Sequence, residues 1–137
     1  MSFTPAELDY LRGQRLGRLA TVQPNGTLQV SPVGFRYNAE TGTIDILGFT
    51  MSTSRKYRNV EANGRAAFVV DDVPSVDPWR VRCLEVRGRA EAVPGTGPGP
   101  GGTDGAVIRV HPERIISFGI DGPDREAHDL VAHNRDA

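Results

Sequence analysis

FTMSTSRKYRNVEANG, residues 49–64, is the stretch around which the rest of the chain is organised. The segment before it, Thr43 to Leu47, predicts a strand, and three hydroxyl side chains then follow at positions 52–54. Hydroxyl groups are favoured N-caps, and an Asn-Gly pair is a favoured helix end. The stretch therefore predicts a strand, a turn and a short helix that ends at Asn63-Gly64.

Two cations, Arg55 and Lys56, fall in the first turn of this helix. The N-terminus of a helix is partly positive, so each cation there costs roughly 0.3–1 kcal/mol unless an anion is bound. Free amides, hydroxyl groups and cations at one helix start are typical of a phosphate site. Lys56 is also the only lysine beside fifteen arginines, and a lysine binds phosphate as a point charge. A solvated helix start with arbitrary surface charges is the alternative interpretation.

The composition is that of one ordinary domain, with 137 residues, 38% hydrophobic and 24% charged. A net charge of -1 gives no long-range electrostatic attraction to nucleic acid. An aromatic content of 7% argues against a platform for base stacking. No apolar run approaches the roughly 20 residues that span a bilayer, and nothing in the first thirty residues resembles a signal peptide. We therefore expect a cytoplasmic protein without a nucleic-acid or membrane partner.

Cysteine and histidine usage argues against a disulfide or a metal site. The single cysteine, Cys83, excludes an internal disulfide, and its surroundings predict a strand. His128 and His133 are five residues apart, which is the wrong spacing for one helical face, and His111 has no partner in sequence. No serine-histidine-acid or paired-carboxylate arrangement stands out, so no catalytic side chain is nominated. If the protein is an enzyme, a cofactor carries the chemistry.

A short helix and a β-hairpin are predicted before the central stretch. Thr4-Pro5-Ala6-Glu7 combines a capping threonine, proline at N1 and the glutamate of a capping box, so a helix runs from there to about Gly13. Strands are predicted from Arg15 to Val22 and from Thr27 to Tyr37. Apolar residues occupy even-numbered positions before Ser31-Pro32 and odd-numbered positions after it. This change of apolar parity, from one face of the strand to the other, predicts a bulge or bend. Its unpaired backbone groups could serve a ligand, or the bulge could only protect an edge strand.

Further strands are predicted after the central stretch. Arg65 to Asp71 is apolar almost throughout, which favours a central strand covered on both faces. After a loop with two prolines, Trp79 to Val93 alternates strictly, as is typical of an antiparallel strand with one wet face. Ala106 to His111 and Arg114 to Ile120 predict two short strands separated by Pro112-Glu113.

Two segments lack such a pattern. Pro94 to Gly105 consists of Gly, Pro, Thr and one Asp, and it has too little apolar area to order itself, so we expect a flexible loop. Its Gly-x-Gly patterns lack the strand-to-helix context of a dinucleotide-binding fingerprint. The tail, residues 121–137, is polar, and a helix is possible around Arg125 to Val131.

These elements predict a mainly β fold, an antiparallel β-barrel with short helices, in a single domain of residues 1–137. Their order resembles the pyridoxamine 5'-phosphate oxidase-like superfamily of split β-barrel flavoproteins. The resemblance covers about Leu8 to Ile120 and is most specific at Phe49-Thr50 and Ser54-Arg55-Lys56. It implies a homodimer with the cofactor in a groove at the subunit interface.

The resemblance also implies which residues bind the cofactor. Residues 54–56 and Thr50 would hold its phosphate, and residues 31–33 would run along its isoalloxazine or deazaflavin ring. The residues assigned to the cofactor are Ser31, Pro32, Val33, Phe49, Thr50, Ser54, Arg55 and Lys56.

The arginine-rich composition and the closing stretch, residues 114–120, resemble the actinobacterial branch that uses the deazaflavin F420. That branch transfers hydride between the cofactor and small organic substrates. Ser31 stands where true pyridoxamine phosphate oxidases carry a ring-edge arginine, which argues against that substrate. FMN is the competing cofactor, because both cofactors present a phosphate and a tricyclic ring. The alternative function is a non-catalytic binder of FMN, F420 or another planar ligand such as haem.

Overall fold

The computed structural model describes residues 2–121 and 130–137. Within these residues the chain forms two α-helices and seven strands, and every strand pair is antiparallel. The elements in chain order are α1 (Pro5–Arg12), β1 (Leu16–Val22), β2 (Leu28–Asn38), β3 (Thr43–Leu47), the 3₁₀ turn η1 (Met51–Thr53), α2 (Arg55–Asn63), β4 (Arg65–Ser75), β5 (Arg80–Val93), the 3₁₀ turn η2 (Pro100–Gly102), β6 (Val107–Phe118) and β7 (His133–Asp136).

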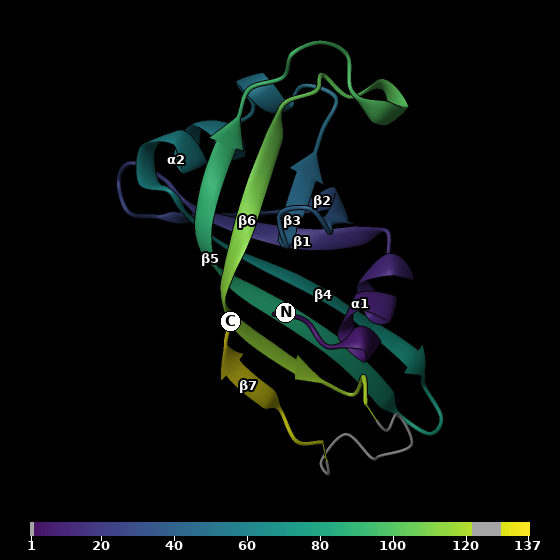
Figure 1. Cartoon of the computed structure of the whole chain (residues 1–137). Coiled ribbons are helices and arrows are strands. Elements are labelled where there is room, and N and C mark those ends of the chain that lie inside the picture. Colours follow the sequence, from purple (N-terminus) through teal and green to yellow (C-terminus); the bar gives the residue numbers. More distant parts are fainter. Residues whose placement is uncertain (1, 122–129) are drawn as a thin grey trace.

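One sheet closes on itself to form the barrel. The strand order is β3-β2-β1-β4-β5-β6-β7, and β3 also pairs with β6, which closes a ring from β1 to β6. This pairing sets Ile44 opposite Val110 and Ile46 opposite Ile108, and all four side chains are fully buried. Below the ring, β4, β5 and β6 continue as an arm, and β7 pairs with β6 there (Figure 1). The predicted mainly β, antiparallel split barrel is confirmed.

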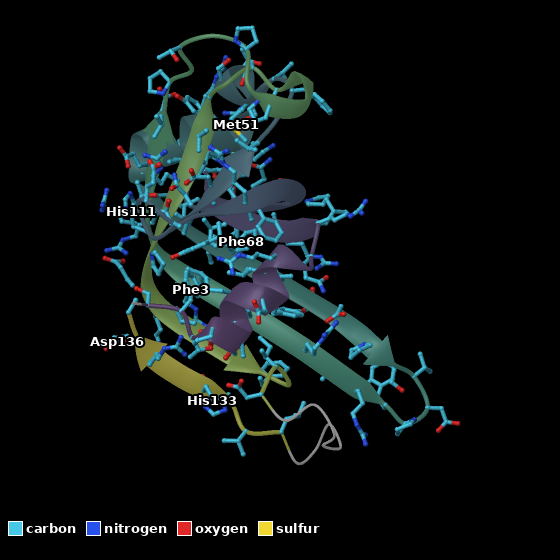
Figure 2. All side chains as sticks on the ribbon, turned by 45° about the vertical axis from the view of Figure 1, so that its right-hand side comes forward. Phe3, Met51, Phe68, His111, His133 and Asp136 are labelled. Atoms are coloured by element: carbon cyan, nitrogen blue, oxygen red, sulfur yellow. The ribbon has the colours of Figure 1, made fainter. Side chains whose placement is uncertain are left out.

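The core lies on the inner face of the strands. On β5, Leu84 and Val86 are fully buried while Arg87 is exposed, as the alternation predicted. β4 lies between β1 and β5, so it is a central strand of the sheet. Its Phe68, labelled in Figure 2, is buried, but Val69 on the other face is only half-buried. The strand was expected to be covered on both faces, but only the face that carries Phe68 is fully covered.

The bulge predicted at Ser31-Pro32 is wrong. β2 pairs with β1 in one unbroken register over residues 28–34 of β2. The apolar parity changes because the outer face of β2 carries the exposed side chains of Leu28 and Val30, whereas on the inner face Val33 is buried. The change of parity thus marks an apolar patch on the outside of the barrel.

The two strands predicted around Pro112-Glu113 are one strand, β6. The register of β6 against β5 shifts by one residue there, so that Gly88 lies opposite Pro112 and Glu113 is extra. A β-bulge accommodates a proline, which has no N–H to donate to the ladder. A Cβ atom at Gly88 would overlap the carbonyl oxygen of His111, so this close approach of the two strands requires glycine.

Three further elements differ from, or extend, the sequence-based expectations. β4 extends to Ser75, into the segment expected to be a loop, while Cys83 lies in β5 as predicted. β7 was not predicted, because residues 133–136 are all polar and have no apolar period. The helix expected around Arg125 to Val131 falls mainly on residues 122–129, which lie outside the described residues; Leu130 and Val131 are described and are not helical.

The N-terminal helix α1 begins with the predicted capping box. Thr4 Oγ1 accepts a hydrogen bond from the Glu7 N–H at 3.1 Å, and Glu7 Oε1 accepts one from the Thr4 N–H at 3.0 Å. Glu7 also joins the helix to the sheet, because Glu7 Oε2 accepts from Ser117 Oγ of β6 at 2.6 Å and from Arg135 Nη1 of β7 at 3.1 Å. Burial raises the pKa of Glu7, but hydrogen bonds from Arg135, Ser117 and Thr4 outweigh it and leave this pKa below its ordinary value.

Replacing Glu7 by Gln should destabilise the fold by about 1.5–3 kcal/mol at about pH 7, because Arg135 loses its charged partner. Since the folded-state pKa of Glu7 is lowered, its stabilisation is complete above the ordinary value of 4.5 and declines as the pH falls through the lowered pKa. Chemical denaturation at about pH 7 and about pH 3 should therefore show a smaller difference between variant and wild type at the lower pH.

Glu61→Gln is the matched control, because Glu61 is exposed on α2. It should be as stable as the wild type at both pH values. A Glu7→Gln variant with wild-type stability at neutral pH would contradict this account of the link between α1, β6 and β7.

Candidate functional site

A cleft between β2, the start of α2 and the 94–105 loop brings together most of the predicted site residues. The start of α2 and this loop lie at the upper end of the molecule in Figure 1. Its volume is about 660 Å³, which is within the range of small-molecule sites. β2, the connection from β3 to α2, the 94–105 loop and the residues before β1 form its walls, and Met51 marks it in Figure 2. The lining residues are Gln14, Arg15, Pro32, Val33, Gly34, Phe35, Leu47, Gly48, Phe49, Thr50, Met51, Ser54, Lys56, Pro100, Gly101 and Thr103.

Short-range hydrogen bonds fix the start of α2 at the cleft. Ser54 Oγ accepts from the Tyr57 N–H at 3.3 Å and donates to the Met51 carbonyl oxygen at 2.7 Å. Ser54 is therefore the N-cap, as predicted, whereas the two hydroxyl residues before it lie in η1 and do not cap α2. Gly64 ends the helix in the left-handed conformation with φ of 74°, so the expected C-cap is also confirmed.

The two cations of the first turn differ in position. Lys56 is half-buried and lines the cleft, whereas Arg55 is exposed and does not. Within residues 2–121 and 130–137, neither side chain has a hydrogen bond or an ion pair. Because the N-terminus of a helix attracts anions and repels cations, Lys56 is placed unfavourably unless the cleft holds an anion. The helix start therefore fits the phosphate of a cofactor.

A buried asparagine fastens α2 to the barrel. Asn59 Nδ2 donates to Thr21 Oγ1 of β1 at 3.0 Å and to Gln29 Oε1 of β2 at 3.3 Å. Its side-chain oxygen is buried and has no hydrogen-bond partner among the described atoms. These contacts fix the helix start relative to β1 and β2. No local sequence pattern links Asn59 to residues so far away along the chain.

β2 supplies the wall expected to contact the cofactor ring. Pro32 and Val33 line the cleft as predicted, but the half-buried Ser31 does not. Gly34 and Phe35, which the sequence did not single out, extend this wall. β2 pairs with β3 only from Gly34 onward, so the edge before it is open toward the cleft. An apolar wall with few polar groups suits a planar ligand.

The 94–105 loop, which the sequence predicts to be flexible, makes specific contacts over the cleft. Asp104 Oδ2 accepts from the Ser52 N–H at 3.0 Å and from Ser52 Oγ at 2.7 Å, and the Asp104 N–H donates to the Gly48 carbonyl oxygen at 3.2 Å. The hydrogen bond from the Ser52 N–H, followed by that from its hydroxyl, holds the pKa of Asp104 below its ordinary value. The exposed ring of Phe49 lies against Gly102. The flexibility of this loop in solution stays a prediction.

Two cleft residues, Gln14 and Arg15, were missed by the sequence reasoning. They lie between α1 and β1 and reach the cleft only because the barrel places this connection beside β2. No Asp, Glu, His, Cys or Tyr is among the lining residues that the structure describes, so Arg15 and Lys56 give the cleft a positive charge. The cleft therefore suits an anionic ligand, and Lys56 is the one described lining residue of a type that commonly acts in acid–base catalysis.

Comparison with known proteins identifies the family. The family model described as pyridoxamine 5'-phosphate oxidase matches residues 3–117. The chain belongs to this family. A 5a,11a-dehydrotetracycline/5a,11a-dehydrooxytetracycline reductase of Streptomyces rimosus is 49% identical over 124 residues, which cover 89% of this chain and 87% of the relative. The relative is thus an oxidoreductase, as the name of the pyridoxamine 5'-phosphate oxidase family also indicates.

Solved structures agree with this membership in the pyridoxamine 5'-phosphate oxidase family. A structure described as an F420 reductase is 30% identical, with a TM-score of 0.53, and the match covers 74% of this chain and 88% of that one. A conserved hypothetical protein of Mycobacterium tuberculosis has the same fold, with 22% identity, a TM-score of 0.66 and coverage of 84% of both chains. No helix among the described residues is long and apolar enough to cross a membrane.

Replacing Asp104 by Ala should release the 94–105 loop from η1. Ser52 loses the acceptor of both its hydrogen bonds, so its amide should exchange with solvent faster. Hydrogen exchange followed by mass spectrometry on peptides that cover η1 and the loop measures this. Asp121→Ala, outside the loop, is the control, and equal exchange in both variants would mean that Asp104 does not hold the loop.

Proposed function

We propose that the protein is an oxidoreductase that transfers hydride between F420, or FMN, and a small organic substrate. The observation that carries the proposal is the cleft, in which an unpaired Lys56 stands at the free start of α2 and no carboxylate lines the wall among the described residues. Such a helix start binds phosphate through its amides and its cation. The relative from Streptomyces rimosus is a reductase, which supports the same type of reaction.

The cleft residues take two roles in this proposal. Residues 54–56 and Thr50 hold the phosphate, with Arg55 reaching it from the exposed side of the helix start. Residues 31–33 and Phe49 lie along the ring, where Pro32 and Val33 already form a wall. When bound, the cofactor supplies the hydride. The chain itself orients the two reactants. Among the described lining residues only Lys56 is of a type that commonly transfers protons, and here it binds the phosphate, so any proton comes from solvent or substrate.

F420 is our first choice of cofactor, and FMN is the second. The F420 reductase is similar in sequence as well as in fold, with 30% identity. The curated relative reduces 5a,11a-dehydrotetracycline, a polycyclic compound, so we propose that the substrate here is also a planar, ring-containing molecule. Titration of the purified protein with FMN and with F420, followed by absorbance, tests the choice of cofactor.

Non-catalytic binding of haem or another planar ligand is the alternative function. Haem iron is usually held by His, Cys, Met or Tyr, and Met51 is the one residue of these types among the described cleft residues. Met51 is buried, and its sulfur lies 3.5 Å from Ser54 Oγ. This arrangement favours the oxidoreductase over a haem binder. Turnover of substrate with reduced cofactor separates the two functions.

A homodimer is part of the proposal, because the outer face of the barrel is apolar beside the cleft. Leu16, Leu28 and Val30 are 62%, 75% and 68% exposed on neighbouring strands β1 and β2. Pro32, which follows on the same face of β2, also lines the cleft. A second copy packed on this patch would bury its apolar area and complete the wall of the cleft.

Replacing Lys56 by Ala should weaken cofactor binding about 10- to 100-fold, because one charge-assisted contact is lost. The cofactor-free protein should melt at the same temperature or slightly higher, since the cation opposes the helix dipole when no anion is bound. A fluorescence or absorbance titration with F420 and FMN, beside a thermal melt of the cofactor-free protein, measures both effects.

Arg58→Ala is the control, because Arg58 is exposed on α2 and does not line the cleft. Its effect on cofactor affinity should be clearly smaller than that of Lys56→Ala. Equal losses in the two variants, or an unchanged affinity of Lys56→Ala, would remove the phosphate site from the proposal.

Replacing Val30 by Asp should convert the dimer to monomers, because a charge would be buried in the apolar contact. The expected mass falls from twice to once the 14.8 kDa of the chain, as measured by sedimentation velocity. Val76→Asp changes a valine that is similarly exposed, at 73%, in the β4–β5 connection, and should leave the dimer intact. A wild-type protein that sediments as a monomer at micromolar concentration would contradict the proposed dimer.

A further inference from the structure

Arg15 is an unpaired cation close to arginines that are paired. Arg18 of β1 forms an ion pair with Asp71, and Arg82 of β5 donates two hydrogen bonds to Asp72, at 2.9 and 2.5 Å. Arg15 has no ion pair or hydrogen bond within the described part of the chain, although it lines the cleft. Its guanidinium group is therefore available to a ligand.

The position of Arg15 is set by the ladder of β1 and β2. Arg15 directly precedes Leu16, which lies opposite Gly34 at the start of β1. The helix α2 is attached near the other end of β1, through the hydrogen bond from Asn59 to Thr21. Leu16 and Thr21 are five positions apart on β1, which corresponds to about 17 Å. Arg15 and the helix that carries Lys56 therefore approach the cleft from opposite ends of the same strand.

The residue before Arg15 is held in place. The Gln14 N–H donates to the Leu11 carbonyl oxygen at 3.2 Å, so its backbone is tied to the end of α1. Gln14 lines the cleft beside Arg15 and is half-buried. The connection between α1 and β1 thus presents Arg15 from an anchored backbone.

The wall between the two cations is apolar. It consists of Val33 and Phe35 of β2 and Leu47 of β3, and the Phe35 ring packs edge-to-face on Phe68 of the core with their centroids 4.9 Å apart. A rigid apolar floor with a cation at each end suits two anionic groups separated by planar rings. In the proposed function, Lys56 already has the phosphate of the cofactor as its partner.

We infer that Arg15 binds an anionic oxygen group of the substrate, a carboxylate or an ionised enol, and so selects anionic planar substrates. The inference rests on the proposed function, because it names the substrate class of the same cleft. A guanidinium group is suited to this role, since its planar set of N–H donors matches two acceptor oxygens at once. Arg15 is a binding residue here and takes no part in hydride transfer.

The test compares two planar probes that differ only in charge, anthraquinone-2-carboxylate and anthraquinone-2-carboxamide. Their dissociation constants are measured by calorimetry on the full chain, with and without bound F420 or FMN. The wild type should prefer the carboxylate by about tenfold or more. Arg15→Ala should remove this preference and leave the affinity for the carboxamide nearly unchanged, whereas Arg15→Lys should keep part of it.

Arg12→Ala is the matched control, because Arg12 is exposed on the last turn of α1, does not line the cleft and pairs with Asp9 at 3.8 Å. It should keep the full preference for the carboxylate. A preference that survives Arg15→Ala would overturn the inference.

Cofactor affinity separates this inference from the proposed function. If Arg15→Ala weakens F420 or FMN binding as much as Lys56→Ala does, Arg15 belongs to the cofactor site and the inference is overturned. If neither cofactor binds the wild type, the proposed function fails, and the probe pair on the cofactor-free protein still decides whether Arg15 selects anions.

Discussion

The pairing of β3 with β6 joins two strands that lie far apart in the sequence and closes the sheet into a ring. β3 leads into the connection that starts α2, and the 94–105 loop leads into β6. Closing the ring therefore brings Asp104 next to Gly48 and Ser52. The ladder itself is held by fully buried aliphatic side chains, each of which contributes roughly 1.5–3 kcal/mol on burial. Two walls of the cleft thus depend on the same pairing.

The buried charged side chains of the scaffold have ion-pair partners, whereas the two described cations of the cleft do not. Buried carboxylates in the scaffold have arginine partners: Asp45 accepts from Arg109 Nε at 3.2 Å, and Glu7 is bound by Arg135. A buried carboxylate without a partner would be costly, so these arginines are required by the fold. Arg15 and Lys56 have no such partner among the described residues and face the cleft. A chain with a net charge of -1 therefore has a cationic cleft.

Features that depend on a few neighbouring residues could be predicted from the sequence. The capping box of α1, the N-cap at Ser54 and the strict alternation of β5 are of this kind, and so is the place of Lys56 at the cleft. Features that depend on distant contacts could not. Arg15 lies at the cleft because β1 pairs with β2, β7 forms because β6 offers an edge, and the parity change at Ser31-Pro32 was misread as a bulge because exposure depends on what covers a face.

The bulge at Pro112-Glu113 divides the long β5–β6 ribbon into two parts. Before it, residues 108–110 of β6 pair with β3 in the ring; after it, residues 114–117 pair with β7 in the arm. A bulge bends a strand and increases its twist, so the two parts can differ in curvature while they share two continuous strands. Gly88 permits this corner. The corner thus lets one pair of strands serve both as part of the ring beside the cleft and as the base of the arm.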